Sequence, residues 1–232
     1  MSLRFSLTLA VLAAAYLLPS VSSAAAGSAT RSVCGYAGYS YAGFQSPRTA
    51  YGVAGRVRAL ATPAVENGHV AAWVGVGGLG MGPRGTDEWV QAGIATHAGT
   101  GQELYYEYAR PGMTEAAYIS LGPVAVGEAH DVAVRERATQ PGTWRVWLDG
   151  RPVSPPIGLP GSHGAWRPIA TAETWDGGIR GCNHYSYAFS KLAIAAQPTG
   201  GWQPFTLDSP MRDPGFSISA RPAGFAASTL SS

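Results

Sequence analysis

Apolar residues along this chain recur at every second position or in short runs, and the spacing typical of amphipathic helices is nearly absent. Each run ends at Gly, Pro or Asp, which favour turns. The pattern predicts strands near residues 50–60, 70–76, 88–96, 103–109, 117–121, 130–138, 143–148, 151–154, 168–175 and 184–195. Short strands at this spacing favour an all-β fold, a two-sheet antiparallel β-sandwich of the concanavalin-like, jelly-roll type.

The segment 143–153 shows the alternation most clearly. Three apolar residues alternate with three that can face water: Trp144, Val146 and Leu148 against Thr143, Arg145 and Trp147. Asp149-Gly150 follows, which is a signal for a two-residue hairpin turn. We therefore expect residues 151–153 to return as the partner strand.

The first 26 residues have the order of charge, apolar run and small residues found in secretory signal peptides. Arg4 supplies the charge, residues 7–18 are almost entirely apolar, and small residues occupy 22–26. The apolar run is short for a membrane span. A membrane anchor is the alternative, but no cationic stop-transfer cluster follows. We expect a signal peptide at residues 1–26, secretion, and no membrane association after its removal.

The mature chain is expected to hold one β-sandwich domain, residues 27–196, followed by a C-terminal tail, residues 197–232. The tail contains Pro, Gly, Ser and Phe and is predicted to be extended or disordered. The whole chain has 31 Gly, 13% charged residues and a net charge of +2, as expected for a compact, turn-rich β protein. No basic stretch alternates with aromatic residues, so nucleic acid is not an expected partner. We expect a monomer.

Two cysteines, Cys34 and Cys182, remain after the signal peptide. An even number in an exported chain predicts one disulfide, and a loop this long would constrain the unfolded chain by about 4–5 kcal/mol. Two buried thiols are the alternative. Two cysteines do not make a zinc site, and no His pair sits at ligand spacing beside them. We expect no metal and no cofactor.

Polar residues inside two apolar strand patterns are the candidates for chemistry. Gln91 shares a strand face with Trp89 and Gly93, and Glu173 shares one with Trp175. A carboxyl group beside Trp and between neutral residues is expected to lose water. Desolvation raises the pKa of a carboxyl group and makes it a usable acid or base. The alternative is that Glu173 faces solvent on the outer side of its sheet.

Four short motifs, taken together, resemble the eqolisins, the secreted glutamic peptidases. They read Trp-Val-Gly-Val at 73–76, Trp-Val-Gln-Ala-Gly at 89–93, Tyr-Tyr-Glu-Tyr at 105–108 and Thr-Ala-Glu at 171–173. In that family a Trp-Val-Gly-Ile strand precedes a Gln-Thr-Gly strand, a Tyr-Glu-Trp segment and a late Glu-bearing strand. Gln91 and Glu173 fall on the family's catalytic pair, and their separation of 82 positions is close to the family's spacing.

The resemblance implies a concanavalin-like sandwich that hydrolyses peptide bonds without metal or cofactor. Glu173 would act as general base and then as acid. Gln91 would hold the attacking water and donate to the oxyanion, a contribution of about 3 kcal/mol. Trp73, Glu107 and Tyr106 would bind the polypeptide substrate, although Trp73 would fit the core equally well.

The sequence departs from the family pattern in two places. The turn after the first Trp reads Val76-Gly77-Gly78, which puts Gly77 where the family has Asp. The strand that carries Glu173 reads Ala-Thr-Ala-Glu, where the family has Trp-Ile-Val-Glu. These differences indicate a distant, bacterial-type branch.

Two other functions fit the same pattern. Concanavalin-like sandwiches also bind glycans without catalysis, and fold does not determine function. In that case Gln91, Glu107 and Asn183 would hydrogen-bond sugar hydroxyls. The third possibility is an inactive relative that keeps only the fold.

Overall fold

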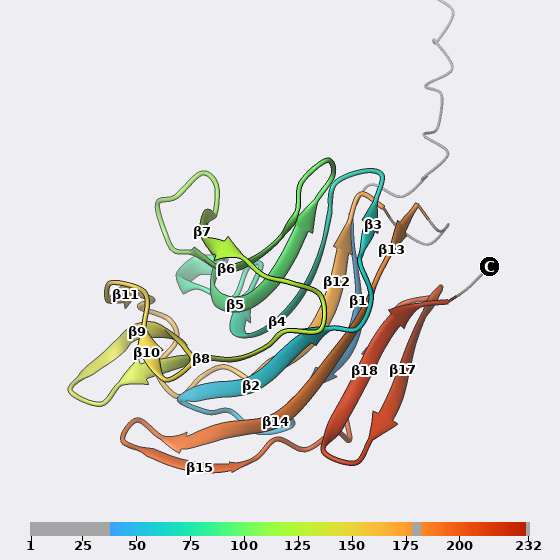
Figure 1. Cartoon of the computed structure of the whole chain (residues 1–232). Coiled ribbons are helices and arrows are strands. Elements are labelled where there is room, and N and C mark those ends of the chain that lie inside the picture. The colour runs from blue at the N-terminus through green and yellow to red at the C-terminus, as the bar shows by residue number, and fades with distance from the viewer. Residues whose placement is uncertain (1–37, 178–181, 231–232) are drawn as a thin grey trace, which may run out of the picture. The chain divides into compact units, whose positions relative to one another are not determined.

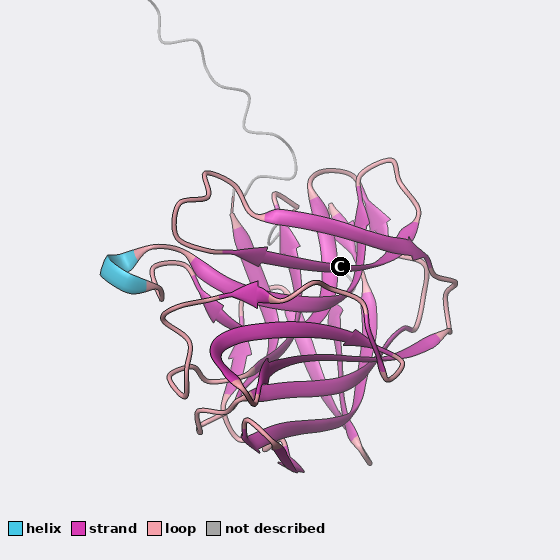
Figure 2. Ribbon diagram, turned by 90° about the vertical axis from the view of Figure 1, so that its left-hand side faces the viewer, coloured by secondary structure: helices cyan, strands magenta, loops and turns pink. Residues whose placement is uncertain are grey.

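The computed structural model describes residues 38–177 and 182–230, and their regular structure is nearly all β-strand (Figures 1 and 2). Among these residues the strands form two large antiparallel sheets and one two-stranded ribbon. A single-turn 3-10 helix, Pro83–Gly85, stands out from the strands (Figure 2). The predicted all-β sandwich is confirmed.

The seven-stranded sheet carries the candidate site. Its strands lie in the order β16 (Pro210–Arg212), β1 (Tyr39–Gln45), β12 (Ile169–Trp175), β4 (His69–Gly78), β5 (Glu88–His97), β6 (Gln102–Ala109) and β7 (Ala117–Pro123). β12, from late in the chain, therefore lies between β1 and β4 (Figure 1). This insertion brings Glu173 onto the same sheet as Gln91.

The nine-stranded sheet lies against it (Figure 1). Its main path is β10 (Arg151–Pro152), β9 (Gln140–Leu148), β8 (Ala129–Arg137), β2 (Gly52–Ala59), β14 (Ser186–Gln197), β18 (Gly224–Thr229) and β17 (Phe216–Arg221). Two further strands pair with this path, β11 (Ile157–Gly158) with β9 and β15 (Gly200–Pro204) with β14. The ribbon consists of β3 (Ala64–Val65) and β13 (Asn183–His184).

The two sheets bury the alternate residues of their strands against each other. On β4 the even-numbered residues from Val70 to Val76 belong to this core, and Ala71 and Trp73 form a separate cluster on the opposite side. From the nine-stranded sheet, Trp144 and Phe189 reach the same core. We call the opposite side of the seven-stranded sheet the cleft face. Alternation thus leaves one face of this sheet for function.

The hairpin predicted at Asp149-Gly150 is present between β9 and β10. Asp149 has φ 49° and Gly150 has φ 76°. Positive φ at both central residues is what a type I′ hairpin turn requires. The prediction of a two-residue turn is confirmed.

The segment predicted to be an extended or disordered tail instead contains β15 to β18. β18 extends the nine-stranded sheet beside β14, and Phe216, Phe225 and Ala227 are buried. Phe216 and Ile218 alternate with serines, so a period-two signal was present. The sandwich therefore continues beyond residue 196, because the apolar side chains of this segment complete its core.

The predicted signal peptide at residues 1–26 and Cys34 lie outside the described residues, and the disulfide with Cys182 stays a prediction. Within the described part of the chain, no helix is both long enough and apolar enough to cross a membrane.

Candidate functional site

A hollow of about 300 Å³ crosses the cleft face. It extends over strands β1, β12, β4, β5 and β6 of the seven-stranded sheet. Its polar and aromatic lining comprises Tyr39, Tyr41, Trp73, Trp89, Gln91, Glu107 and Glu173. Aromatic walls with a few convergent polar groups are typical of ligand-binding sites.

Gln91 and Glu173 lie on a diagonal of the sheet with Trp73 between them. Gln91 pairs with Gly75 of β4, and Glu173 pairs with Ala71 of the same strand. Trp73 is midway between these two β4 residues and its side chain is on the same face. The predicted pair therefore flanks the Trp73 ring from opposite sides.

Glu173 is 3% exposed, so its carboxylate points into the hollow and not into bulk water. Its Oε1 atom lies 3.3 Å from Nε2 of His69. The His69 ring stacks on Trp175 at a centroid distance of 5.9 Å and meets the edge of Tyr39 at 6.1 Å. Aromatic rings thus hold the histidine that contacts the carboxylate.

Gln91 is 8% exposed, and its side-chain amide donates to two oxygens. Nε2 is 3.1 Å from the hydroxyl of Tyr105 and 3.3 Å from Oε2 of Glu107. A primary amide has two N–H donors, so these two contacts fix its orientation. The Gln91 amide is therefore held in place before any ligand binds.

Glu107 is a carboxyl group of the site with a displaced pKa. Burial, and after it the charge of Glu173, raise its pKa from 4.5, while His69 and the hydrogen bond from Gln91 lower it, and together they leave the pKa at about 7. A carboxyl group with this pKa is mostly protonated in acid. Displaced pKa values of this kind gather at functional sites.

The predicted substrate-binding residues divide between the two faces. Trp73 and Glu107 are on the cleft face, and Trp73 is 6% exposed. Within the described residues, Nε1 of Trp73 is buried and has no hydrogen-bond partner. Tyr106 points the other way, into the core between the sheets, because it is one residue out of phase with Glu107. The assignment of Tyr106 to the cleft is wrong, and Tyr105 takes its place.

Gly77 occupies the position where the resemblance places an aspartate, and the backbone there requires glycine. Its φ is 86°, and a Cβ atom would lie 2.2 Å from the carbonyl oxygen of Glu88. A side chain is excluded at this position by sterics and by backbone conformation. The carboxylate groups of this cleft therefore come from other strands.

Asn183 is not a cleft residue. It is 1% exposed, its Oδ1 accepts from the backbone N–H of Glu66, and its Nδ2 donates to the carbonyl of Asn67 and to Thr174. These bonds tie the turn before β4 to the end of β12. The side chain is used for structure, and the prediction that it binds a sugar hydroxyl does not fit this position.

His69 and Tyr105 contact the predicted pair but were not among the predicted residues. Period two would have placed Tyr105 on the face of Glu107 and His69 on the face of Trp73. The contact between His69 and Glu173 depends on the register of β12 against β4, which the sequence pattern does not give. Among the described residues, no group of three or more His, Cys, Asp or Glu side chains is placed to hold a metal ion.

Comparison with known proteins finds similarity at the level of fold. No protein-family model matches this chain, and no curated protein sequence matches it. The structure of scytalido-glutamic peptidase with a transition state analog inhibitor superposes with a TM-score of 0.56 at 12% identity, covering 84% of this chain and 98% of the peptidase. The structure of SCP-B, a member of the eqolisin family, in complex with the tripeptide Ala-Ile-His gives 0.55 at 11% identity with the same coverage.

Proposed function

We propose that this protein is a secreted endopeptidase that cleaves polypeptides on its cleft face with Glu173 and Gln91. The observation that carries the proposal is that Gln91, Glu107 and Glu173 line one hollow. The fold likeness to two peptidase structures, one with a transition state analog and one with a tripeptide, supports it. The predicted export signal and the Cys34–Cys182 disulfide belong to the same proposal, since both suit an exported chain.

The substrate would lie across the strands over Trp73. Tyr39 and Tyr41 form the wall on the Glu173 side, and Gln91 and Glu107 form the opposite side. A peptide in this position has its scissile bond between the two catalytic groups.

Hydrolysis needs one base, one oxyanion donor and one acid. Glu173 removes a proton from water as the water oxygen attacks the carbonyl carbon, and an N–H of Gln91 donates to the oxygen that becomes negative. Protonated Glu173 then gives its proton to the leaving amine. Both N–H groups of Gln91 are engaged in the free protein, so the longer contact, to Glu107, yields to the substrate.

Glu107 assists as a neutral carboxyl group. Its pKa of about 7 keeps it protonated in acid. A neutral Glu107 avoids repulsion with an ionised Glu173 in the same hollow. This arrangement favours activity below neutral pH.

The test is digestion of denatured casein from pH 2 to 7 by the wild type, Glu173→Gln and Gln91→Ala. We expect the wild type to cut and both variants to lose at least about 100-fold in rate, with circular dichroism showing an unchanged fold. Glu103→Gln, on β6 but outside the hollow, is the matched control and should cut normally. If the wild type cuts nothing at any pH, the peptidase proposal is wrong and the hollow becomes a candidate glycan site.

A further inference from the structure

A second hollow, of about 330 Å³, lies on the nine-stranded sheet and shares no residue with the first. Trp147 on β9 and Trp202 on β15 line it. Four strand spacings separate these strands in the order β9, β8, β2, β14, β15, a distance of roughly 19 Å. The hollow is therefore a groove that suits a chain-like ligand. We call it the rear groove.

The rear groove presents flat aromatic surface to water. Trp202 is 42% exposed. Ala133 of β8 lies directly between Trp147 of β9 and Ala54 of β2 in the register, so short side chains leave the space between the two rings open. An aromatic ring exposed beside an open groove can stack on the apolar face of a sugar ring.

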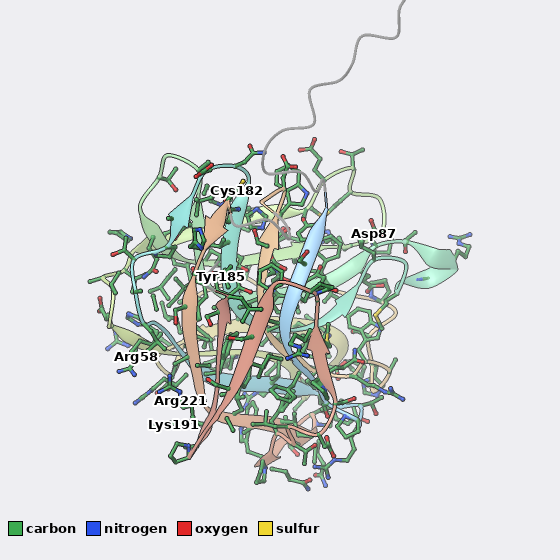
Figure 3. All side chains as sticks on the ribbon, turned by 90° about the vertical axis from the view of Figure 1, so that its right-hand side faces the viewer. Arg58, Asp87, Cys182, Tyr185, Lys191 and Arg221 are labelled. Carbon is green, nitrogen blue, oxygen red and sulfur yellow. The ribbon has the colours of Figure 1, made fainter. Side chains whose placement is uncertain are left out.

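Positive charge gathers around the rear groove. Lys191 and Arg135 line it, and Arg56 is fixed at its side by two bonds of 2.7 and 2.6 Å to Asp131. Lys191 and Arg58 extend outward from the molecule (Figure 3). The outward positions of strands β2, β8 and β9, with the β14 bulge, supply these cations: Arg56, Arg58, Arg135, Arg137, Arg145 and Lys191. They alternate with core residues, so no basic run is visible in the sequence.

Two of these cations are held in unfavourable positions. Arg135 and Arg145 are directly opposite on β8 and β9, and like charges in such a pair destabilise a sheet. Nε of Arg145 is buried and has no hydrogen-bond partner among the described residues. Arg135 lies over the Trp147 ring at 5.2 Å. An anion placed between the two guanidinium groups would relieve the repulsion.

The backbone conformation at Lys191 is a third observation that points to a binding site. Lys191 has φ 52°, a left-handed conformation rare for a lysine. It lies where the pairing of β14 with β2 shifts register, between Ser190 and Ala193. Bulges of this kind redirect a side chain, and strain of this kind gathers at functional sites. Here the redirected side chain is an ammonium group at the rear groove.

We propose that the rear groove binds an acidic polysaccharide, a polymer of sugars that carry carboxylates. Its rings stack on Trp202, and Trp147 forms the far wall of the groove. Its carboxylates bind Lys191 and Arg135, and also Arg145, which lines an adjoining hollow together with Arg135 and Trp147. Asp131 accepts hydrogen bonds from sugar hydroxyls. A single-stranded DNA would also stack and neutralise the cations, but its deoxyriboses have no free hydroxyl along the chain to donate to Asp131. The chemistry of the groove therefore favours a glycan.

Binding is tested on the full mature chain by affinity electrophoresis through gels that contain polygalacturonate, neutral dextran or single-stranded DNA. We expect retardation by polygalacturonate only. Trp202→Ala should weaken binding about tenfold, because one stacking ring is lost. Trp175→Ala, with a similarly exposed ring at the cleft face, and Arg84→Ala, on the 3-10 turn, are matched controls that should bind as the wild type does.

Arg145→Gln separates a ligand-binding role from a structural one. It removes one of two opposed cations, so the thermal midpoint should rise while affinity for polygalacturonate falls about tenfold. Casein digestion, a property of the cleft face, should be unchanged in Trp202→Ala and Arg145→Gln. The proposal is overturned by any of three results: equal retardation by dextran, preferential binding of DNA, or binding that Trp202→Ala and Arg145→Gln leave intact.

Discussion

His69 contacts Glu173 across two neighbouring strands, with 3.3 Å between Nε2 and Oε1. In the register of β4 and β12, His69 is opposite Trp175 and therefore two residues beyond the position facing Glu173. The contact is thus diagonal, and the stacked Trp175 ring supports it. The orientation of the proposed base depends on an imidazole as well as on its own strand.

Removal of this imidazole should lower activity without unfolding the protein. His69→Ala deprives a 3%-exposed carboxylate of a hydrogen-bond partner, and we expect kcat/KM for casein to fall about tenfold. His69→Gln, which keeps an N–H donor, should recover part of the loss. His184→Ala, at an exposed histidine on β13, is the control. Unchanged kinetics in His69→Ala would show that the contact does not position Glu173.

Glu107 makes stability depend on pH in a defined direction. Its pKa rises from 4.5 in the unfolded chain to about 7 in the folded protein, so between these values the folded state holds a proton that the unfolded state has released. The stabilising effect is complete below about pH 4.5 and is lost as pH rises through about 7. The free energy of unfolding should therefore decrease across this range, by about 1–2 kcal/mol after allowance for partial exposure of the side chain.

Urea denaturation at pH 4, 5.5 and 7.5 measures this effect. Glu107→Gln stays neutral throughout, so its stability should fall less than that of the wild type across the range. Glu103→Gln, with the same change of charge four residues earlier on β6, should follow the wild type. Parallel curves for the wild type and Glu107→Gln would contradict the assignment.

The period-two pattern predicted the sandwich and the strand faces of Gln91 and Glu173, because alternation records which side chains are buried. It also places Tyr105 on the strand face of Glu107, although the prediction assigned Tyr106 to the cleft. The contact of His69 with Glu173 and the clustering of arginines around the rear groove depend on strand order and register. These are features of the tertiary structure, which the pattern of one strand does not contain. Pro and Gly interrupt the segment that forms β15 to β18, so the pattern predicted no strands there, although Phe216 alternates with serine.

Substitution of Gly93 tests whether the close packing of β4 against β5 maintains the site. A Cβ atom there would lie 1.9 Å from the carbonyl oxygen of Ala72 and 2.7 Å from Cα of Trp73. Gly93→Ala should therefore separate the two strands, with a loss of about 1–3 kcal/mol in the free energy of unfolding. Gly101→Ala, where nothing lies within 4 Å of the added atom, is the matched control. Equal thermal midpoints for the two variants would show that the strands adjust at little cost.

A buried tryptophan holds the loop before β12 against the core through a hydrogen bond. Loss of this bond should lower stability and leave the cleft residues in place. Trp144 and Ser162 are both fully buried, and Nε1 of Trp144 donates to Oγ of Ser162 at 2.7 Å. Ser162→Ala leaves the indole N–H without that acceptor, so the free energy of unfolding should decrease by about 1–3 kcal/mol.

Thermal and urea denaturation of Ser162→Ala measure the effect, with Ser209→Ala, at an exposed serine, as the control. Because Ser162 precedes β12 and does not line either hollow, casein digestion at a temperature well below the midpoint should match that of the wild type. A variant as stable as the wild type would mean that the indole N–H finds another acceptor. A stable variant with reduced digestion would instead mean that the loop sets the position of β12, and with it the position of Glu173.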